Sequence, residues 1–275
     1  MVNRMTRSLG RPLGGVAVAI GITTAMDAGG LTAFSALPLF PLMLLLWYAE
    51  RPPRLPMGFS AGRTEWYGLA ILYPLAVLGS LAAIAHLAGA TNLVTANWAT
   101  ALRQAARVGS GTLLVVILTE EGFFRGWLWS SLRRAEMTPT GTLIVTSVCF
   151  SLWHLSWATL TADGRLPATE LPVFMVNAAV IGAIWGLLRA GSGSVFVPSL
   201  SHGLWNGIDY VFFGAAAKTG ALGIANTAVY GPEIGLLGLA ANVVVAVLLW
   251  RWWRARAPVD VSEPGATMEQ SGASQ

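Results

Sequence analysis

Long apolar stretches recur along this chain from residue 12 to residue 250. Only 11% of the residues are charged, whereas a soluble globular domain uses roughly 25% to cover its surface. An apolar stretch of about 17 to 25 residues is long enough to cross the ~30 Å hydrocarbon core of a bilayer as a helix. The sequence therefore predicts an all-α fold, a polytopic membrane helical bundle, with room for one membrane domain and little else.

Eight windows of this length can be placed in the sequence. They lie near 12-28, 31-49, 66-89, 110-132, 140-160, 171-188, 195-214 and 232-253. The first window is the weakest, because it is short, ends at Asp27 and follows several arginines, as the apolar part of a signal peptide does. No clear cleavage site comes after it, so we expect an uncleaved first helix and about eight transmembrane helices in all.

The segment between the third and fourth windows has a different pattern. Apolar residues repeat there at four-residue spacing and two arginines fall off their line: Val94, Trp98 and Leu102, with Arg103 and Arg107. A helix with one apolar face and basic residues beside it lies on the membrane surface. We therefore expect a short amphipathic surface helix near 93-108.

The positive residues are distributed unequally between the two sides of an eight-span topology with both termini inside. Inside fall Arg4, Arg7, Arg11, Arg51, Arg54, Arg63, Arg133, Arg134, Arg189, Arg251, Arg254 and Arg256, and outside fall Arg103, Arg107, Arg165 and Lys218. Because positive residues concentrate in cytoplasmic loops, this distribution predicts cytoplasmic termini. The arginines lie in short loops and form no separate basic domain, which argues against nucleic-acid binding.

The fourth window contains two adjacent carboxylates and a guanidinium, Glu120, Glu121 and Arg125. Each charge inside a bilayer costs a few kcal/mol unless it is paired or faces a wet cavity. Glu121 and Arg125 stand four residues apart, so they share a helix face and can pair. Glu120 lies about 100° around the helix and is not matched by the same arginine. A salt bridge that locks the bundle would explain the pair but not Glu120.

Further polar side chains lie in later windows: His154 in the fifth, and His202 and Asn206, on one helix face, in the seventh. Polar side chains from facing helices can converge in a bundle core. Such a set suits hydrolysis, with Glu120 as general base, His154 holding the same water, and His202 and Asn206 as donors to an oxyanion. No serine or cysteine is obviously placed as a nucleophile. The remaining histidine, His86, is interpreted as interfacial or structural.

Three motifs in this order resemble those of the CPBP intramembrane protease family: Glu-Glu-x-x-x-Arg at 120-125, Phe-x-x-x-His at 150-154 and His-x-x-x-Asn at 202-206. This family, also called Abi, includes the type II CAAX prenyl endopeptidases and bacteriocin-processing or self-immunity proteins. The resemblance covers about residues 110-250. It implies that Glu120 and His154 activate water, and that Glu121 and Arg125 support the site. His202 and Asn206 would form the oxyanion hole.

The resemblance leaves the question of a cofactor open. The family has also been described as metal-dependent, and Glu120, His154 and His202 could supply three ligands to a divalent metal such as zinc, with a fourth position for water. The chain has no His-Glu-x-x-His helix, so a zincin-type site is not indicated. Asp209 either extends the polar face of Asn206 or is a solvated helix end, and Asp27 is interpreted in the same way.

We therefore predict an intramembrane endopeptidase, metalloprotease-like or glutamate-type, that cuts a protein or peptide substrate, lipidated or not, in or near the bilayer. The alternatives are a non-catalytic immunity or scaffold protein and, less favoured, an ion-coupled transporter. The predicted divisions are N-terminal transmembrane helices and surface helix at 1-109, a CPBP-like catalytic core at 110-253 and a polar, disordered tail at 254-275. The expected location is a bacterial cell membrane.

Overall fold

Apolar sequence of helix length folds into helices through most of the chain in the computed structural model, which describes residues 2–50, 54–94, 96–162, 164–215 and 218–256. In this part, six helical segments are long and apolar enough to cross a membrane. They are Leu9–Ala28, Glu65–Leu87, Trp98–Arg134, Pro139–Leu160, Leu171–Ser192 and Leu236–Arg256. The chain is an integral membrane protein with an all-α bundle fold.

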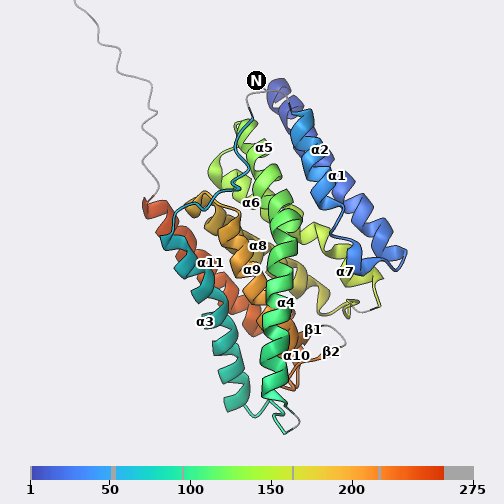
Figure 1. Ribbon diagram of the computed structural model, residues 1–275, viewed down its shortest axis with the longest axis vertical. Helices are drawn as coiled ribbons and strands as arrows, with labels where there is room; N and C mark the ends of the chain where they lie inside the picture. The colour runs from blue at the N-terminus through green and yellow to red at the C-terminus, as the bar shows by residue number, and fades with distance from the viewer. Residues whose placement is uncertain (1, 51–53, 95, 163, 216–217, 257–275) are drawn as a thin grey trace, which may run out of the picture.

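The long helices lie side by side and run roughly along the long axis of the bundle (Figure 1). In chain order they are α1 (Val2–Ala28), the short 3-10 helix η1 (Thr32–Phe34), α2 (Leu39–Ala49), α3 (Glu65–Leu87), α4 (Trp98–Leu118), the π-helix η2 (Gly122–Leu128), α5 (Trp129–Arg134), α6 (Pro139–Trp153), α7 (Leu155–Leu160), α8 (Leu171–Ser192), α9 (Phe196–Ile208), the π-helix η3 (Asp209–Phe213), β1 (Gly214–Ala215), β2 (Lys218–Thr219), α10 (Thr227–Tyr230) and α11 (Leu236–Arg256). The two strands pair antiparallel in a small hairpin.

The prediction of eight spans is wrong, because two of the windows form helices too short to cross a bilayer. Window 31-49 contains α2, which has 11 residues, and window 195-214 contains α9, which has 13 residues. At 1.5 Å per residue these helices are about 17 and 20 Å long, against a ~30 Å core. Pro38 directly precedes α2, and α9 gives way to a π-helical turn at Asp209. A hydropathy window counts apolar residues and does not register such interruptions.

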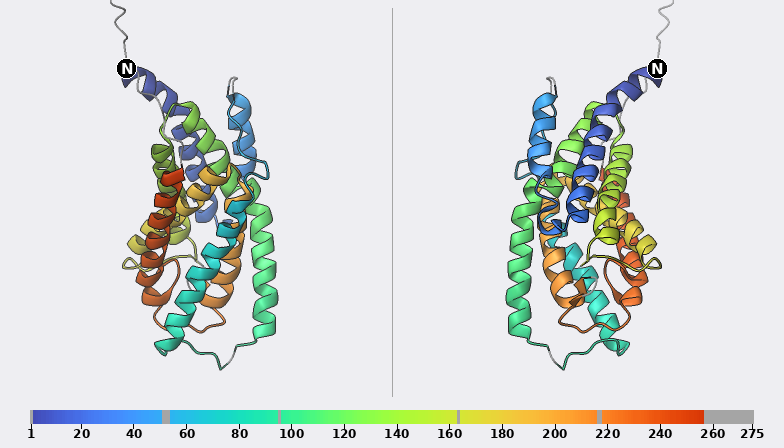
Figure 2. Two further views of the ribbon diagram at one scale, coloured as in Figure 1. Left: turned by 90° about the vertical axis from the view of Figure 1, so that its left-hand side faces the viewer. Right: turned by 90° about the vertical axis from the view of Figure 1, so that its right-hand side faces the viewer.

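The predicted surface helix near 93-108 is also wrong as a separate element. The Asn97 side chain accepts a hydrogen bond from the Thr100 amide at 3.0 Å and caps a helix that begins at Trp98. That helix, α4, continues without a break to Leu118, and with η2 and α5 it forms a 37-residue segment. Figure 2 shows α4 as a long helix at one edge of the bundle. The amphipathic pattern therefore marks the beginning of a span.

Helices α4 and α9 approach each other closely through glycines. A β-carbon added to Gly203 would meet the Gly109 carbonyl oxygen at 2.8 Å, and one added to Gly207 would meet the Ala105 carbonyl oxygen at 2.7 Å. Small residues let helix backbones pack closely inside a membrane, where van der Waals contact rather than water drives association. This packing sets the distance between the carboxylates that follow α4 and the polar side chains of α9.

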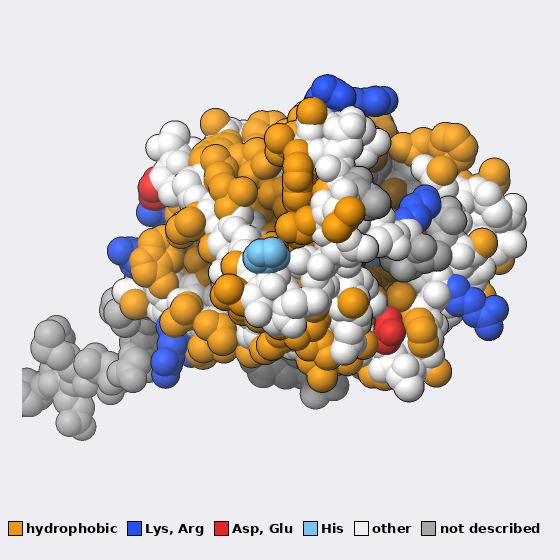
Figure 3. All heavy atoms as spheres, turned by 90° about the horizontal axis from the view of Figure 1, so that it is seen from below, with side chains coloured by type: hydrophobic (Ala, Val, Ile, Leu, Met, Phe, Trp, Pro, Cys, Tyr) orange, Lys and Arg blue, Asp and Glu red, His pale blue; other side chains and the backbone are white. Residues whose placement is uncertain are grey.

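The outer surface of the bundle is apolar, as lipid contact requires. Leu72 of α3, Leu114 of α4 and Val244 of α11 are all exposed. On the end opposite the N-terminus, charged side chains are few and lie toward the margin, while hydrophobic side chains spread across the view (Figure 3).

Several sequence predictions are not tested by this architecture. An even number of spans places both ends of the helical part on one side of the membrane, but the cytoplasmic orientation stays a prediction. The predicted domain division at 109 falls within α4 and also stays a prediction. The predicted disordered tail lies, from residue 257 onward, outside the described residues.

Candidate active site

Glu120 and Glu121 lie at a break in the helix. Thr119, which ends α4, has φ −98° and ψ −94°, outside the α-helical region, and the chain resumes as the π-helix η2. A π-helical turn holds more residues than an α-helical turn and is frequent at functional sites. Glu121 is completely buried, whereas the Glu120 side chain is partly exposed and lines a cavity. The two adjacent carboxylates therefore have different environments.

Glu121 and Arg125 form an ion pair inside the bundle. Arg125 Nη1 lies 3.1 Å from Glu121 Oε1, and both side chains are 0% exposed. The other end of the guanidinium donates from Nη2 to the Gly182 carbonyl oxygen at 3.0 Å, and its carbon lies 4.3 Å from the centre of the Phe150 ring. Arg125 thus connects η2 to α6 and α8. The attraction between the two charges offsets much of the free-energy cost of burying them.

His202 connects this pair to Glu120. Its Nδ1 lies 3.1 Å from Glu121 Oε1, so we assign a proton to Nδ1, which then donates to the carboxylate. Its Nε2 faces Glu120 Oε2 at 4.0 Å. Trp185 of α8 stacks on the imidazole with ring centres 3.9 Å apart and an interplanar angle of 17°. The ring orientation of His202 is therefore determined by a hydrogen bond and a stacking contact.

His154 approaches Glu120 from another helix. Its Nε2 lies 3.9 Å from Glu120 Oε2, and its Nδ1 lies 2.9 Å from the Phe150 carbonyl oxygen. Because a carbonyl oxygen only accepts, Nδ1 carries the proton and a neutral His154 presents the lone pair of Nε2 to the cavity. The rings of Phe150 and Trp153 contact the imidazole edge to face at 4.5 and 4.8 Å.

One cavity of about 340 Å³ joins the four residues that the sequence predicts as catalytic, Glu120, His154, His202 and Asn206. The side chain of Asn206 makes no hydrogen bond within the part of the chain that the structure describes, so its amide is available to a ligand. Most of the remaining lining is aromatic or aliphatic: Ala33, Ala36, Phe150, Trp153, Trp157, Phe174, Ala178, Ile181, Trp185 and Tyr210.

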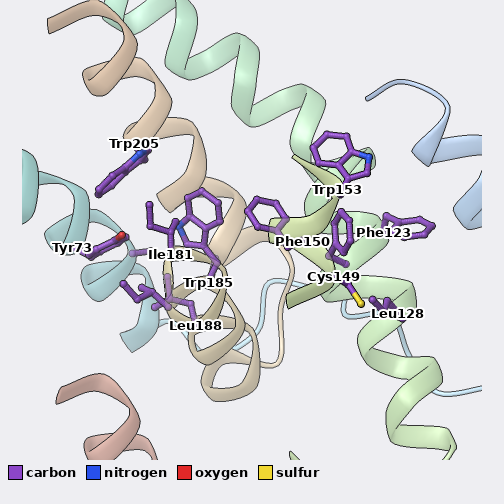
Figure 4. Packing of buried hydrophobic residues seen from close by; sticks show 14 of the residues in the cluster. Tyr73, Phe123, Leu128, Cys149, Phe150, Trp153, Ile181, Trp185, Leu188 and Trp205 are labelled. Atoms are coloured by element: carbon purple, nitrogen blue, oxygen red, sulfur yellow. The ribbon is translucent and has the colours of Figure 1, made fainter. Parts of the chain in front are cut away.

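The aromatic packing continues behind the cavity and holds its helices together. Trp185 lies beside Phe150, and Trp205 of α9 faces Tyr73 of α3 (Figure 4). The ring centres of the second pair are 5.3 Å apart in a stacked arrangement.

His86 lies outside the cavity and contacts Thr91 Oγ1 through Nδ1 at 3.0 Å.

Two carboxylates of the cavity wall have no role in the sequence prediction. Asp27, in the last turn of α1, is 3% exposed and accepts a hydrogen bond from Ser156 Oγ at 2.6 Å. Glu233, in the turn before α11, accepts a hydrogen bond from Trp205 Nε1 at 3.0 Å. Desolvation raises the pKa of the Glu233 carboxyl above its ordinary value.

Of the two alternatives for Asp27 and Asp209, the solvated helix end is wrong, because both side chains are buried, Asp209 at 2% exposure. The sequence does contain a signal for Asp27. A carboxylate in the last turn of a helix opposes the helix dipole and needs a compensating partner. Glu233 stands just before a span in a Gly-Pro-Glu sequence, where nothing in the local pattern distinguishes it from a loop residue.

A metal site is not evident in the arrangement. Among the described residues, no group of three or more His, Cys, Asp or Glu side chains could hold a metal ion. Ligands about 2.0–2.2 Å from a tetrahedral zinc lie roughly 3.3 Å from one another, whereas Glu120 Oε2 is 3.9 and 4.0 Å from the nitrogens of His154 and His202. The three predicted ligands would have to move together to bind zinc.

Comparison with known protein families finds a match to this chain. Residues 104–208 match the Rce1-like family model, described as type II CAAX prenyl endopeptidase Rce1-like. The matched segment begins within α4, ends with the last residue of α9 and contains all four predicted catalytic residues. No curated protein matches this chain, and no solved structure matches it.

Proposed function

We propose that this chain, whose residues 104–208 match the Rce1-like family model, is a CAAX-protease-like intramembrane endopeptidase of the CPBP family that hydrolyses a peptide bond with water activated by Glu120 and His154. The observation that supports this most is the position of Glu120 Oε2, which faces His154 Nε2 at 3.9 Å and His202 Nε2 at 4.0 Å in one cavity. These distances are too long for direct hydrogen bonds, and a polar gap of this size suits a bridging water.

The proton positions define the activation step. A water in the gap donates one hydrogen to Glu120 Oε2 and the other to the lone pair of His154 Nε2, which leaves an oxygen lone pair directed at the substrate. Glu120 removes its proton as the water oxygen attacks the carbonyl carbon of the scissile bond. His154 keeps its orientation because Nδ1 donates to the Phe150 carbonyl oxygen.

The carbonyl oxygen becomes negative as the tetrahedral intermediate forms. The Nδ2 group of Asn206 and a protonated Nε2 of His202 donate hydrogen bonds to it, as fixed donors in an oxyanion hole do. His202 can donate from Nε2 only when both ring nitrogens carry protons, and Glu121 accepts from Nδ1 at 3.1 Å. Glu121 and Arg125 are therefore positioning residues. When the carbon–nitrogen bond breaks, Glu120 returns its proton to the leaving amine.

This mechanism is of the glutamate type and uses no metal, in accordance with the distances between the three candidate ligands. The substrate is a protein or peptide at the membrane. The predicted cytoplasmic orientation of both termini belongs to this proposal. Reporter domains fused to each end, read for activity inside and outside the cell, would test it.

The test of the function is Glu120→Gln, which preserves the shape of the side chain and removes the base. Loss of general-base catalysis lowers rates by about 10²–10⁴-fold, and the amount of folded protein should be unchanged because the Glu120 side chain makes no direct hydrogen bond to any other described residue. Carboxy-terminal ends of cellular proteins would be compared by mass spectrometry between cells with wild-type and variant protein. The matched control is Glu136→Gln, the same change at an exposed carboxylate outside the cavity.

The three possible outcomes are distinct. A set of carboxy-terminal ends that disappears with Glu120→Gln and persists with Glu136→Gln supports the proposal. Full processing by the Glu120→Gln protein would refute the mechanism. A chain that binds membrane proteins with no change in their ends in either variant would instead be a non-catalytic scaffold.

A further inference from the structure

The cavity contains two carboxylates that the proposed mechanism does not use. Asp27 comes from α1 and Glu233 from the turn before α11, and both line the cavity together with Glu120. None of the described residues that line this cavity is lysine or arginine. The guanidinium of the motifs, that of Arg125, is 0% exposed and paired with Glu121. The described lining of the cavity therefore has three carboxylates, those of Asp27, Glu120 and Glu233, against the two imidazoles of His154 and His202.

Asp27 has an oxygen that lacks a donor. Ser156 Oγ donates to its Oδ2 at 2.6 Å, but its Oδ1 is buried and has no hydrogen-bond partner among the described residues. Two hydroxyls of the same wall donate elsewhere, Thr23 Oγ1 to the Ser35 carbonyl oxygen at 3.2 Å and Ser35 Oγ to the Thr32 carbonyl oxygen at 3.0 Å. A buried carboxylate oxygen without a donor is costly. A ligand that brings an N–H group would remove that cost.

Glu233 is held in place by both its side chain and its backbone. Trp205 Nε1 donates to Oε1 at 3.0 Å, and Asn177 Nδ2 donates to the Glu233 carbonyl oxygen at 2.9 Å. Its second carboxylate oxygen accepts no hydrogen bond within the described part of the chain. Clefts with low-dielectric walls and charges of one sign concentrate the field and attract ions of the opposite sign. The carboxylates in the described lining of this cavity outnumber its histidines, so the cavity favours a cation.

We propose that Asp27 and Glu233 form an acidic subsite that binds a lysine or arginine side chain of the substrate beside the peptide bond that Glu120 hydrolyses. The aromatic rings of Trp153, Trp157 and Phe174 line the same cavity. Their faces suit the aliphatic stem of such a side chain and attract its cationic end. The location beside a scissile bond rests on the proposed function, whereas the binding of a cation does not.

The experiment measures binding without turnover. The full chain with Glu120→Gln is purified in detergent and titrated with two fluorescent, end-capped tripeptides, leucine-arginine-leucine and leucine-citrulline-leucine. Citrulline has nearly the shape of arginine and no charge. We expect the arginine peptide to bind about tenfold more tightly, because hydrogen bonds to a charged group are stronger than neutral ones. Adding Asp27→Asn should bring the ratio close to one, and adding Glu233→Gln should lower it by several-fold.

The matched control is Glu50→Gln. Glu50 is a carboxylate buried to the same degree, at 2% exposure, and it does not line the cavity, so the preference for arginine should be unchanged. Equal binding of the two peptides, or no binding of the arginine peptide, overturns the proposal. An arginine preference that persists in both the Asp27→Asn and the Glu233→Gln protein also overturns the proposal. The two variants are made separately, so one can be tested if the other does not fold.

The subsite and the proposed function fail separately. If Glu120→Gln abolishes processing in cells but the purified protein shows no preference for arginine, the subsite is refuted and the protease stands. If the preference is present and depends on Asp27 while Glu120→Gln changes no carboxy-terminal ends, the cation site stands and the protease is refuted.

Discussion

Removing Arg125 alone should destabilise the protein much more than removing Arg125 and Glu121 together. Both side chains are 0% exposed, so Arg125→Met leaves the Glu121 carboxylate buried, with His202 Nδ1 as its one remaining partner among the described residues. Deleting one member of a buried ion pair costs about 3–5 kcal/mol, whereas replacing both members by apolar residues is often neutral. Two further atoms of the pair, Glu121 Oε2 and Arg125 Nε, lack hydrogen-bond partners among the described residues. Replacing both residues removes these two unpaired atoms as well, so the loss of stability should be smaller still.

The single cysteine of the chain allows this to be measured. Cys149 is 7% exposed, so a dye that becomes fluorescent on reaction with thiols reports unfolding in detergent. At roughly 2–4 °C per kcal/mol, Arg125→Met should lower Tm by about 6–20 °C. Glu121→Leu with Arg125→Met should recover most of that loss. The recovered protein should still be inactive, because His202 no longer has an acceptor at Nδ1.

Two results would refute this reasoning. A loss below about 1 kcal/mol for Arg125→Met would mean that Glu121 does not need Arg125 as a partner. A double variant as unstable as the single one would mean that the guanidinium stabilises the bundle through its contacts with Gly182 and Phe150 rather than through the ion pair.

Three further predictions follow from other parts of the structure. Treatment of the purified enzyme with a chelator should leave hydrolysis at Glu120 unchanged, and metal analysis should find no stoichiometric zinc; activity lost to the chelator and restored by zinc would contradict this. Gly191→Ala should destabilise the protein by about 1–3 kcal/mol, because the new β-carbon would lie 1.9 Å from Trp66 Cζ2, while Gly68→Ala, with nothing within 4 Å, should not lower Tm. Because burial raises the pKa of Glu233, the folded state keeps that proton longer than the unfolded state, so stability falls as pH rises from the ordinary carboxyl range through the raised pKa. Glu233→Gln should therefore lose less Tm than the wild type between pH 5 and pH 8, and equal losses would show that Glu233 is ionised in the fold.

The sequence alone determines that this chain belongs in a membrane and which residues are out of place there. Both conclusions depend on local quantities, namely the length of an apolar stretch and the cost of a charge or an imidazole inside it. Glu120, His154, His202 and Asn206 can be identified in this way, and the spacing of Glu121 and Arg125 predicts their pairing because helical geometry is local.

Only the tertiary structure decides where the helices end and which side chains meet. The turn before α2 and the π-helical turn after α9 make the helices in two apolar windows shorter than the windows. Helix α4 packs against α9 through Gly109 and Gly203, and the segment predicted as a surface helix is part of this span. Asp27 reaches Ser156 across 129 residues of sequence. Contacts of this kind depend on how helices approach one another, so no local pattern could place Asp27 and Glu233 in the same cavity as Glu120.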